Sequence, residues 1–395
     1  MSSSSALRIV HVFRAPLGGL FRHVIDLSVE QAARGHAVGL FFDSEGDGRR
    51  VREAIARIPG GAQLGVVTTP IPRNPHLRDL FALRALSRFL KSTKPDVVHG
   101  HGSKGGLYAR FLGAPIRAYT PHGGSFNYSP GSALHRLYMQ VERAMARRTD
   151  LFLFESDNIR GKYDQYVGLR AGIARVVVNG LSPAEFSPAI PAQDAADILY
   201  VGELRAAKGV DTLLDALALV GRETGAVPSA VFVGSGPDRE ALIAQAARLG
   251  ISDRVRFPGP MPVRRAFESG RIMAAPSRAE SMPYIVLETV AAQVPLLTTD
   301  VGGVPEIFGP YRDRLGSPDD PVGLARRIVA EMNRPAQERA SRAKQLADYV
   351  KARFSVEQMA DAVIAAYREA LASRELDRRS SRSARASAAQ IVNEA

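Results

Sequence analysis

Short apolar runs alternate with amphipathic stretches along nearly the whole chain. Residues 7–13 form an apolar run typical of a buried strand, and residues 21–35 carry apolar side chains at helical spacing and end at Gly35. The same alternation recurs through "PDVVHGH", "IRAYTPH" and "DLFLFES". Buried parallel strands, each followed by a helix that covers the sheet, produce this pattern. The chain is therefore expected to be an α/β protein with parallel sheets.

The alternation lapses once, over the Pro- and Ala-rich residues 183–197, and restarts at "ILYVG". We therefore expect two α/β domains of similar size, residues 1–185 and residues 186–350. The last helical pattern falls within residues 351–372. Residues 373–395 are rich in Ser, Arg and Ala without apolar periodicity, which predicts a disordered basic tail. A solvated tail is favoured over one that touches anionic lipid.

Composition limits the partners. The 395 residues are 45% hydrophobic, enough for two ordinary cores. The net charge of +12 favours phosphorylated or polyanionic partners, or an anionic membrane surface. Zinc-finger and RNA-binding signatures are missing, so nucleic acid is not expected as a partner. The absence of cysteine excludes disulfides and thiolate metal sites, and fits a reducing compartment.

The N-terminal residues "MSSSSALRIVHVF" lack a basic region ahead of a long apolar run, and no eighteen residues in a row are apolar. We therefore expect neither a signal peptide nor a membrane-spanning helix. The expected location is the cytoplasm, with peripheral contact at the inner face of the cytoplasmic membrane suggested by the positive charge.

Two glutamates, Glu280 and Glu288, enclose the mostly apolar segment "SMPYIVL". Proline fits the first turn of a helix and disrupts its interior, so a helix is predicted to start near Pro283. Glu280 then lies in the preceding loop and Glu288 one to two turns inside the helix. The free N–H groups at the helix start can bind phosphate, and the carboxylates can accept hydrogen bonds from sugar hydroxyls. On this segment alone, a capping and a surface glutamate explain the pattern equally well.

Strand-to-helix turns carry further candidates. Residues 201–209, "VGELRAAKG", place Arg205 and Lys208 at the carboxyl end of a strand, where ligands of open α/β sheets bind. Two cations there can neutralise a diphosphate, although solvated helix-start cations are an equal alternative. The turns at Gly202 and Gly234 contain small residues that let a ligand approach the backbone.

The first domain has its own glycine turn and several histidines. The turn at Gly18 and Gly19 is not GxGxxG, and no acidic residue ends the predicted second strand at the usual ribose position, which counts against a dinucleotide oxidoreductase. His99 and His101 end one strand, and His122 ends another beside paired glycines. Their spacing matches no helix-borne metal-ligand pair, so no bound metal is expected. His122 is expected to contact a substrate hydroxyl, and a structural role is the alternative for His99.

These segments, in this order, resemble the glycosyltransferase family 4 enzymes of the GT-B fold. The resemblance covers most of residues 7–372. It rests above all on Glu280 and Glu288 with seven residues between them, followed by "VGGVPE". The looser elements are the first glycine pair, "RGH", "PDVVHGH", "PHGG", "VNGLSPAEFSP", "VGELRAAKG" and "VGSGP".

The resemblance implies two facing Rossmann-like α/β domains with an active site in the cleft between them. The first would hold the acceptor, the second a UDP- or GDP-type sugar nucleotide, and the helix in residues 351–372 would cross back to the first. The implied activity is transfer of a sugar with retention of configuration to a glycan or lipid-linked glycan, without a cofactor or metal. The role would be in cell-surface polysaccharide synthesis, as a monomer or weak dimer.

The resemblance also assigns roles by position. Arg205 and Lys208 would bind the diphosphate. Glu203 stands where the family often has arginine, so Arg205 takes that role. Glu280 would bind the sugar hydroxyls, Glu288 the ribose, and His122 the sugar near the reacting carbon. The sugar and phosphates would be lined by the first loop at Gly18 and Gly19 and by the backbone of Ser281, Met282, Pro283, Tyr284 and Ile285.

Fixed cations and a helix terminus can stabilise a leaving nucleoside diphosphate. A second carboxylate for double displacement is not evident, so same-face attack assisted by the leaving phosphate is the hypothesis. The alternatives are a GT-B sugar-nucleotide epimerase and a non-catalytic sugar-binding protein.

Overall fold

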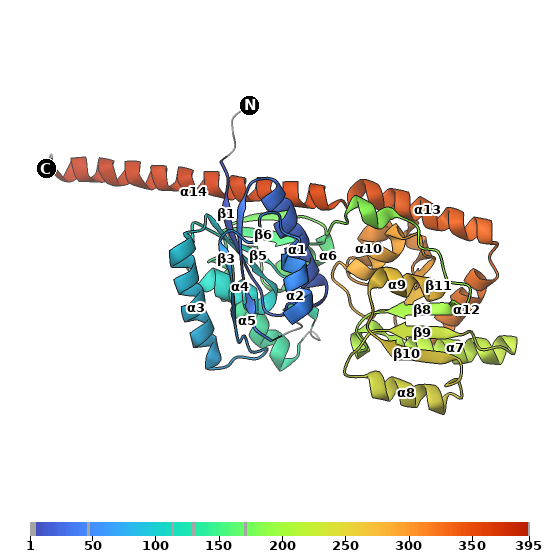
Figure 1. The fold of residues 1–395 in the computed structure, drawn as a ribbon. Helices are drawn as coiled ribbons and strands as arrows, with labels where there is room; N and C mark the ends of the chain where they lie inside the picture. The colour runs from blue at the N-terminus through green and yellow to red at the C-terminus, as the bar shows by residue number, and fades with distance from the viewer. Residues whose placement is uncertain (1–4, 46–47, 113, 128–130, 170–171, 394–395) are drawn as a thin grey trace. The chain divides into compact units, whose positions relative to one another are not determined.

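The computed structural model describes residues 5–45, 48–112, 114–127, 131–169 and 172–393. The chain divides into two compact units (Figure 1). Unit 1 comprises residues 1–178 and 356–395, and unit 2 comprises residues 179–355. None of the helices in the described part of the chain has both the length and the apolar content that a membrane span requires.

Unit 1 is built on a seven-stranded parallel sheet in the order β3-β2-β1-β4-β5-β6-β7. Its strands are β1 (Arg8–Val12), β2 (Ala37–Asp43), β3 (Gly65–Thr69), β4 (Val97–His101), β5 (Ile116–Thr120), β6 (Leu151–Phe154) and β7 (Ile173–Val176). Its α-helices are α1 (Gly18–Ala33), α2 (Gly48–Ile55), α3 (Arg78–Thr93), α4 (Gly102–Phe111), α5 (Ala133–Ala146), α6 (Asp157–Tyr166) and α14 (Val356–Asn393).

Helix α14 belongs to unit 1 although it comes last in the chain. Its buried side chains recur every three or four residues and pack against Leu7, Ile9, Val97 and Leu153 of the sheet core. They are Val356, Met359, Ala360, Val363, Ala366, Tyr367 and Ala370. The helix continues to Asn393, which differs from the disordered tail predicted for residues 373–395. The extension is rich in Ala and Arg, which have high helix propensity even without an apolar partner.

Unit 2 contains a five-stranded parallel sheet in the order β10-β9-β8-β11-β12. Its strands are β8 (Ala196–Val201), β9 (Ala230–Val233), β10 (Val255–Gly259), β11 (Gly270–Ala275) and β12 (Leu296–Thr298). Its α-helices are α7 (Val210–Thr224), α8 (Arg239–Arg248), α9 (Val263–Glu268), α10 (Tyr284–Ala291), α11 (Val304–Phe308), α12 (Pro321–Met332) and α13 (Ala336–Arg353). Short 3₁₀ turns η1 (Gly124–Asn127), η2 (Pro183–Phe186), η3 (Ala206–Lys208) and η4 (Gly309–Arg314) complete the two units.

Both sheets are Rossmann-like: all their strands are parallel and the strand order reverses near the middle. The prediction of two parallel α/β domains is therefore confirmed. The reversal lies between β1 and β4 in unit 1, and between β8 and β11 in unit 2. Loops that leave the carboxyl ends of such strands diverge to opposite faces and open a crevice where ligands bind. Each unit therefore has one predicted ligand position.

Candidate functional site

The two loops at the reversal point of unit 2 carry Lys208 and Glu280. Lys208 ends η3 after β8, and Glu280 lies in the loop that follows β11. The Lys208 Nζ lies 2.6 Å from Glu280 Oε1, and the Ser277 hydroxyl donates to the same oxygen at 2.7 Å. Glu280 is only 8% exposed. A carboxylate taken out of water in this way is stable because both contacts compensate its lost hydration.

The paired-glycine turn after β12 packs directly against the Glu280 backbone. Gly302 has a φ of +58°, and a Cβ atom there would lie 1.9 Å from the Glu280 carbonyl oxygen. The Gly303 N–H donates to the Ser281 carbonyl at 2.7 Å. Only glycine satisfies both the backbone angle and the close approach. This packing explains why "VGGVPE" accompanies the two glutamates.

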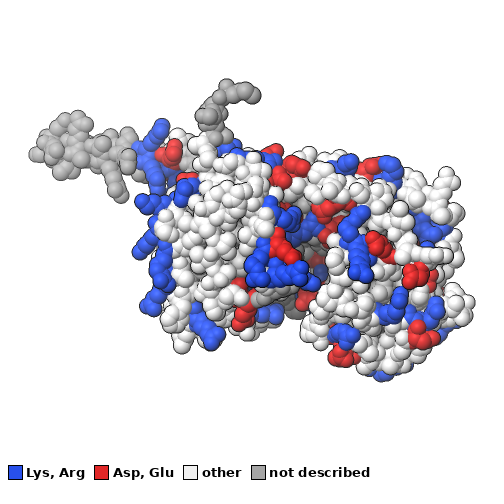
Figure 2. Space-filling model, viewed as in Figure 1, with Lys and Arg blue, Asp and Glu red and all other residues white. Residues whose placement is uncertain are grey.

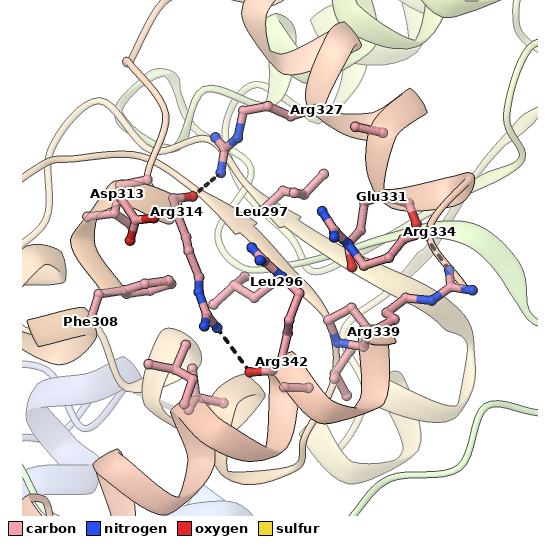
Figure 3. Close-up of a pocket in the computed structure, with 17 residues that line it drawn as sticks. Leu296, Leu297, Phe308, Asp313, Arg314, Arg327, Glu331, Arg334, Arg339 and Arg342 are labelled. Carbon is pink, nitrogen blue, oxygen red and sulfur yellow. Dashed lines mark hydrogen bonds and ion pairs between the residues drawn. The ribbon is translucent and has the colours of Figure 1, made fainter. Parts of the chain in front are cut away.

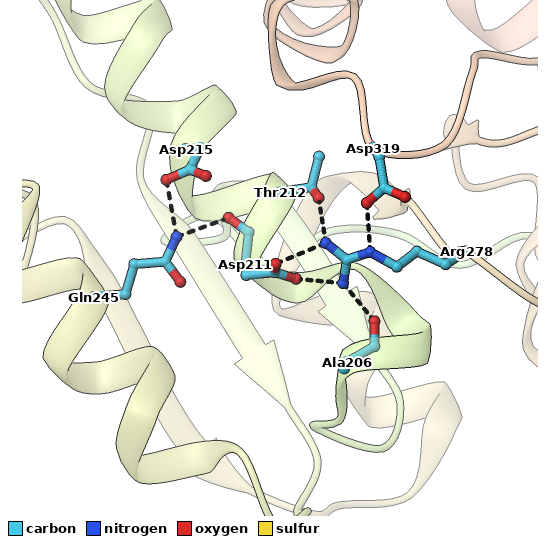
Figure 4. Close-up of polar contacts among 7 residues, drawn as sticks. All are labelled: Ala206, Asp211, Thr212, Asp215, Gln245, Arg278 and Asp319. Atoms are coloured by element: carbon cyan, nitrogen blue, oxygen red, sulfur yellow. Dashed lines mark hydrogen bonds and ion pairs between the residues drawn. The ribbon is translucent and has the colours of Figure 1, made fainter. Parts of the chain in front are cut away.

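Arg278 joins the Lys208 turn to the Glu280 loop (Figure 4). Its N–H donates to the Ala207 carbonyl at 2.9 Å, and its guanidinium donates to both Asp211 oxygens at 2.7 Å and to Asp319. These hydrogen bonds raise the pKa of Arg278. Burial works against the charged form of Asp211, but the bonds from Arg278 outweigh it and lower that pKa. Sequence reasoning missed Arg278, because its acidic partners lie in separate segments.

Arg205 shares the turn with Lys208 but has a different partner. Its Nε lies 2.7 Å from Glu203 Oε2, and both side chains are about half exposed, at 45% and 54%. Glu203, which departs from the family pattern, therefore holds the arginine assigned to the diphosphate. Gly202 and Gly234 are explained by packing: a Cβ on Gly234 would lie 1.8 Å from the Gly202 carbonyl oxygen.

Helix α10 begins at Tyr284 with Pro283 as its N-cap, within a residue of the predicted start. Glu280 lies ahead of the helix and half-buried Glu288 lies inside it. The buried Met282 is held by the Asn179 side chain, which donates to its carbonyl at 2.8 Å. Ser281 precedes it and Ile285 lies in the first turn. The predicted phosphate-binding terminus and the carboxylates are thus on adjacent parts of unit 2.

At the reversal point of unit 1, histidine rings form a hydrogen-bonded chain. The His122 Nε2 lies 3.1 Å from His101 Nδ1, and the His101 Nε2 lies 3.0 Å from His11 Nδ1. The His11 Nε2 lies 2.8 Å from Gln31 Oε1. His99 bonds instead to the Tyr367 hydroxyl at 2.7 Å and to Thr120 at 2.8 Å, which gives it a structural role.

Burial decides the charge of this cluster. It lowers the pKa of His11 to about 4, and it lowers the pKa of His99, His101 and His122 well below the usual value. Neutral rings each have one donor and one acceptor nitrogen. If Gln31 accepts from His11, the chain runs in one direction and leaves His122 Nδ1 with a lone pair. That nitrogen suits a group that accepts a hydrogen bond from a substrate hydroxyl.

Neutral imidazoles are also ligands for transition metals. Two sets have ring nitrogens within 4.8 Å of one another: His11, His99 and His101, and His23, His101 and His122. Sequence spacing missed this convergence, because the rings come from β1, α1, β4 and the loop after β5. The ring nitrogens of each set are chemically suitable ligands for a metal ion. The hydrogen bonds between the rings also explain their arrangement without a metal.

A cavity of about 330 Å³ adjoins the end of the histidine chain in unit 1. It is lined by His101 and His122, by Arg14 and Arg73, and by Leu17 and Leu20, which flank the Gly18–Gly19 turn. Among the residues that the structure describes, neither Arg14 nor Arg73 forms an ion pair. This positive lining makes the cavity suitable for an anionic group.

The statement that no acidic residue closes the second strand was wrong. Strand β2 ends in Asp43, which is buried and accepts hydrogen bonds from the backbone N–H groups of Ile71 at 3.0 Å and Glu45 at 3.3 Å. These bonds occupy one of its oxygens with its own chain. Asp43 is therefore explained as a loop-fixing carboxylate rather than a ribose ligand.

Comparison with known proteins identifies a glycosyltransferase family model for each part of the chain. Residues 17–185 match the model of Glycosyltransferase Family 4, and residues 195–333 match that of Glycosyl transferases group 1. The chain is 27% identical over 372 residues to a glycogen synthase of Mycobacterium tuberculosis, covering 83% of this chain and 86% of that protein. It is 28% identical over 296 residues to the putative glycosyltransferase EpsD of Bacillus subtilis, covering 67% and 75%.

Solved structures show the same fold. A sucrose-phosphate synthase from Thermosynechococcus elongatus has a TM-score of 0.77 at 21% identity, covering 93% of this chain and 100% of that one. Anabaena HepE in complex with UDP-glucose has a TM-score of 0.74 at 19% identity, again covering 93% and 100%. The chain belongs to the glycosyltransferases of the GT-B fold.

Proposed function

We propose that the protein transfers a sugar, with retention of configuration and without a bound metal, from a UDP- or GDP-sugar that unit 2 binds. The observation that supports this most is the Lys208–Glu280 pair at the reversal point of unit 2, next to the start of α10. A leaving nucleoside diphosphate gains negative charge as the glycosidic bond breaks. A fixed ammonium and oriented backbone N–H groups stabilise that charge without reorganisation.

The two glutamates take different parts in this proposal. Glu280 is held on one oxygen by Lys208 and Ser277, which suits a group that orients sugar hydroxyls rather than a nucleophile that must move. Glu288, inside α10, binds the ribose. We therefore favour same-face attack, in which the leaving phosphate assists the acceptor hydroxyl. Arg205 reaches the diphosphate only if Glu203 releases it, so its contribution is smaller than that of Lys208.

The acceptor is a glycan or lipid-linked glycan that carries an anionic group. The cavity of unit 1 supports this, because Arg14 and Arg73 line it together with His122. A phosphate or carboxylate of the acceptor would bind the two guanidinium groups, and His122 Nδ1 would accept a hydrogen bond from a hydroxyl. Such acceptors are consistent with a role in cell-surface polysaccharide synthesis.

Helix α3 supports peripheral contact with an anionic membrane. Leu77, Leu80 and Phe81 at its start are 77%, 56% and 66% exposed. The exposed cations Arg84 and Arg88 continue the same face of the helix. Figure 2 shows Lys and Arg side chains along the edge of unit 1 that carries α3. Apolar side chains next to cations are typical of a surface that enters the interface of an anionic bilayer.

A donor screen followed by a product assay tests the proposed activity. UDP-, GDP- and ADP-sugars are compared by thermal shift, since a ligand that binds the folded state raises the melting temperature. The donor that binds is then incubated, as labelled sugar, with lipid-linked glycan acceptors, and the anomeric configuration of the product is determined by NMR. We expect retained transfer. An epimerised sugar nucleotide would indicate the epimerase, and binding without turnover would indicate a sugar-binding protein.

A further inference from the structure

Unit 2 contains a cavity of about 280 Å³ whose lining combines five arginines with mostly apolar side chains. It lies between the end of α10, strand β12 and helices α12 and α13. Two acidic residues, Asp313 and Glu331, also line it. Figure 3 shows the guanidinium groups of Arg334 and Arg342 extending toward the middle of this pocket. The five lining arginines are Arg314, Arg327, Arg334, Arg339 and Arg342.

Among the described residues, Arg334 is the only one of these five arginines that forms an ion pair with a carboxylate. Arg334 pairs with Glu331 at 2.9 Å and with Glu338. The bonds of Arg314 and Arg327 go to neutral groups: Arg327 donates to the carbonyls of Thr298 and Arg314.

Arg314 donates to the Arg342 carbonyl at 3.0 Å and to the Gln345 side chain at 3.2 Å. Arg339 has one long contact, 3.5 Å, with the Glu331 carbonyl. For Arg342, no side-chain hydrogen bond is found within the described part of unit 2. Since each guanidinium has five N–H donors, most of the donor capacity in the pocket remains available.

The positive charges are held together at an electrostatic cost. Burial, followed by the nearby charge of Arg342, lowers the pKa of Arg314. Burial also lowers the pKa of Arg327. All five arginines are partly buried, so water and salt screen their repulsion less than on an open surface. An anion bound among the five guanidinium groups would be attracted by them, and this attraction would offset their mutual repulsion.

The pocket is separate from the proposed donor site within unit 2. It borders Pro295 and Leu296, at the amino end of β12. Lys208 and Glu280 lie in loops at the carboxyl ends of β8 and β11, which are parallel to β12. Neither Lys208 nor Glu280 lines the arginine pocket, so a ligand bound there would be distinct from the donor's diphosphate.

We propose that this arginine pocket binds a small phosphorylated metabolite, with its phosphate held by Arg314, Arg339 and Arg342. Guanidinium groups bind phosphate oxygens through paired, charge-assisted hydrogen bonds. The volume lies at the low end of small-molecule sites, which favours a compact molecule such as a sugar phosphate over a polymer.

Calorimetry with glucose 6-phosphate, inorganic phosphate and glucose as probes tests this proposal on the full chain. Both phosphate-bearing probes should bind, glucose 6-phosphate more tightly, and glucose should not. Arg342→Ala, which removes no side-chain hydrogen bond among the described residues, should weaken glucose 6-phosphate binding at least about tenfold, as expected for loss of one charged contact. Added NaCl should weaken it as well.

Two variants separate the sites. Arg326→Ala removes an exposed arginine of α12 that does not line the pocket, and Lys208→Ala removes the donor-site ammonium. Both should bind glucose 6-phosphate like the unaltered protein. The proposal is overturned if neither phosphate-bearing probe binds, or if binding survives Arg342→Ala and is lost in Lys208→Ala. Because these measurements need no turnover, they remain decisive if the proposed transferase activity fails.

Discussion

The contact between Lys208 and Glu280 limits the chemical role that either side chain can have. The ammonium and the carboxylate neutralise each other across 2.6 Å, and Ser277 fixes the carboxylate further. In the proposed complex, the diphosphate would contact the Lys208 ammonium, and the second oxygen of Glu280 would accept hydrogen bonds from sugar hydroxyls. The pair therefore keeps both groups in place before the donor arrives, which lowers the reorganisation that binding requires.

Lys208→Ala and Glu280→Ala should each lower kcat/KM by about 10²-fold or more, the scale of losing one charge-stabilising group in an active site. Steady-state kinetics with the donor found in the screen measures this. Glu240→Ala removes a carboxylate that is 83% exposed and serves as the control. Full activity in correctly folded Lys208→Ala and Glu280→Ala proteins would refute the assignment.

The buried histidines make stability depend on pH. Burial lowers the pKa of His11 to about 4 in the folded chain, against 6.5 for the free side chain. Between these two pH values, His11 is protonated in the unfolded chain and neutral in the folded chain. The contribution of neutral His11 to the free energy of unfolding is therefore present above pH 6.5 and is lost as the pH falls toward 4. Each such histidine adds about 1.4 kcal/mol per pH unit to this slope.

Urea unfolding between pH 7 and pH 5 should show a falling free energy of unfolding, and His11→Asn should make the fall shallower. This range lies above the pKa of most carboxylates, so the histidines dominate it. Equal slopes for the two proteins would mean that His11 titrates normally in the folded state.

At the level of secondary structure, the proposed donor site is a set of loops that position one another. The η3 turn, the loop after β11 and the glycine turn after β12 are joined by Arg278 and by the packing of Gly302 on Glu280. A side chain introduced at one loop should therefore displace the proposed catalytic groups of the next.

Gly302→Ala should lower activity at least about tenfold, because a displacement of an ångström misplaces Glu280. Gly225→Ala is the matched control: Gly225 also has a positive φ, +79°, but nothing lies within 4 Å of an added Cβ. Gly225→Ala carries the backbone strain without the close contact, so activity lost only in Gly302→Ala would confirm the contact. Equal activities would show that the loop tolerates the shift.

Helix α3 gives a second prediction at this scale. Replacing both Leu80 and Phe81 by Ser should reduce sedimentation with phosphatidylglycerol vesicles, because the double change removes apolar area worth about 0.8 kcal/mol per buried CH₂. Leu376→Ser, at a position 63% exposed on α14, is the control and should sediment normally. Unchanged sedimentation of the double variant would exclude α3 as the contact surface.

At the scale of the whole molecule, unit 1 is made from two distant parts of the chain. Residues 1–178 supply the sheet, and α14 supplies seven side chains of the core beneath it. Burial of that many side chains contributes of the order of 10 kcal/mol, which is comparable with the stability of an entire domain.

A chain that ends at Ser355 should therefore lose the fold of unit 1, whereas a chain that ends at Ser380 retains those seven side chains and should keep it. Hydrogen exchange followed by mass spectrometry reports each unit separately. We expect peptides of unit 1 to lose protection only in the shorter chain, while β8 and β9 of unit 2 stay protected. Protected β1 and β4 in the shorter chain would contradict the packing.

Much of this arrangement could be read from local patterns. Apolar strands alternating with amphipathic helices predict the two parallel sheets, since a strand buried on both faces has few other solutions. Pro283 predicts where α10 begins, and with it the different positions of Glu280 and Glu288. The extension of α14 beyond residue 372 was not predicted, because helix propensity without an apolar face leaves helix and coil close in free energy.

Local sequence patterns are enough to predict the α/β class, the two sheets and the loops in which the candidate residues lie. Which side chains meet follows only from the folded chain. Lys208 meets Glu280, Arg205 meets Glu203, and histidines of three segments join into one chain. The reason is physical: periodicity records whether a side chain faces a core, while the strand order of the folded sheet decides which distant loops lie side by side.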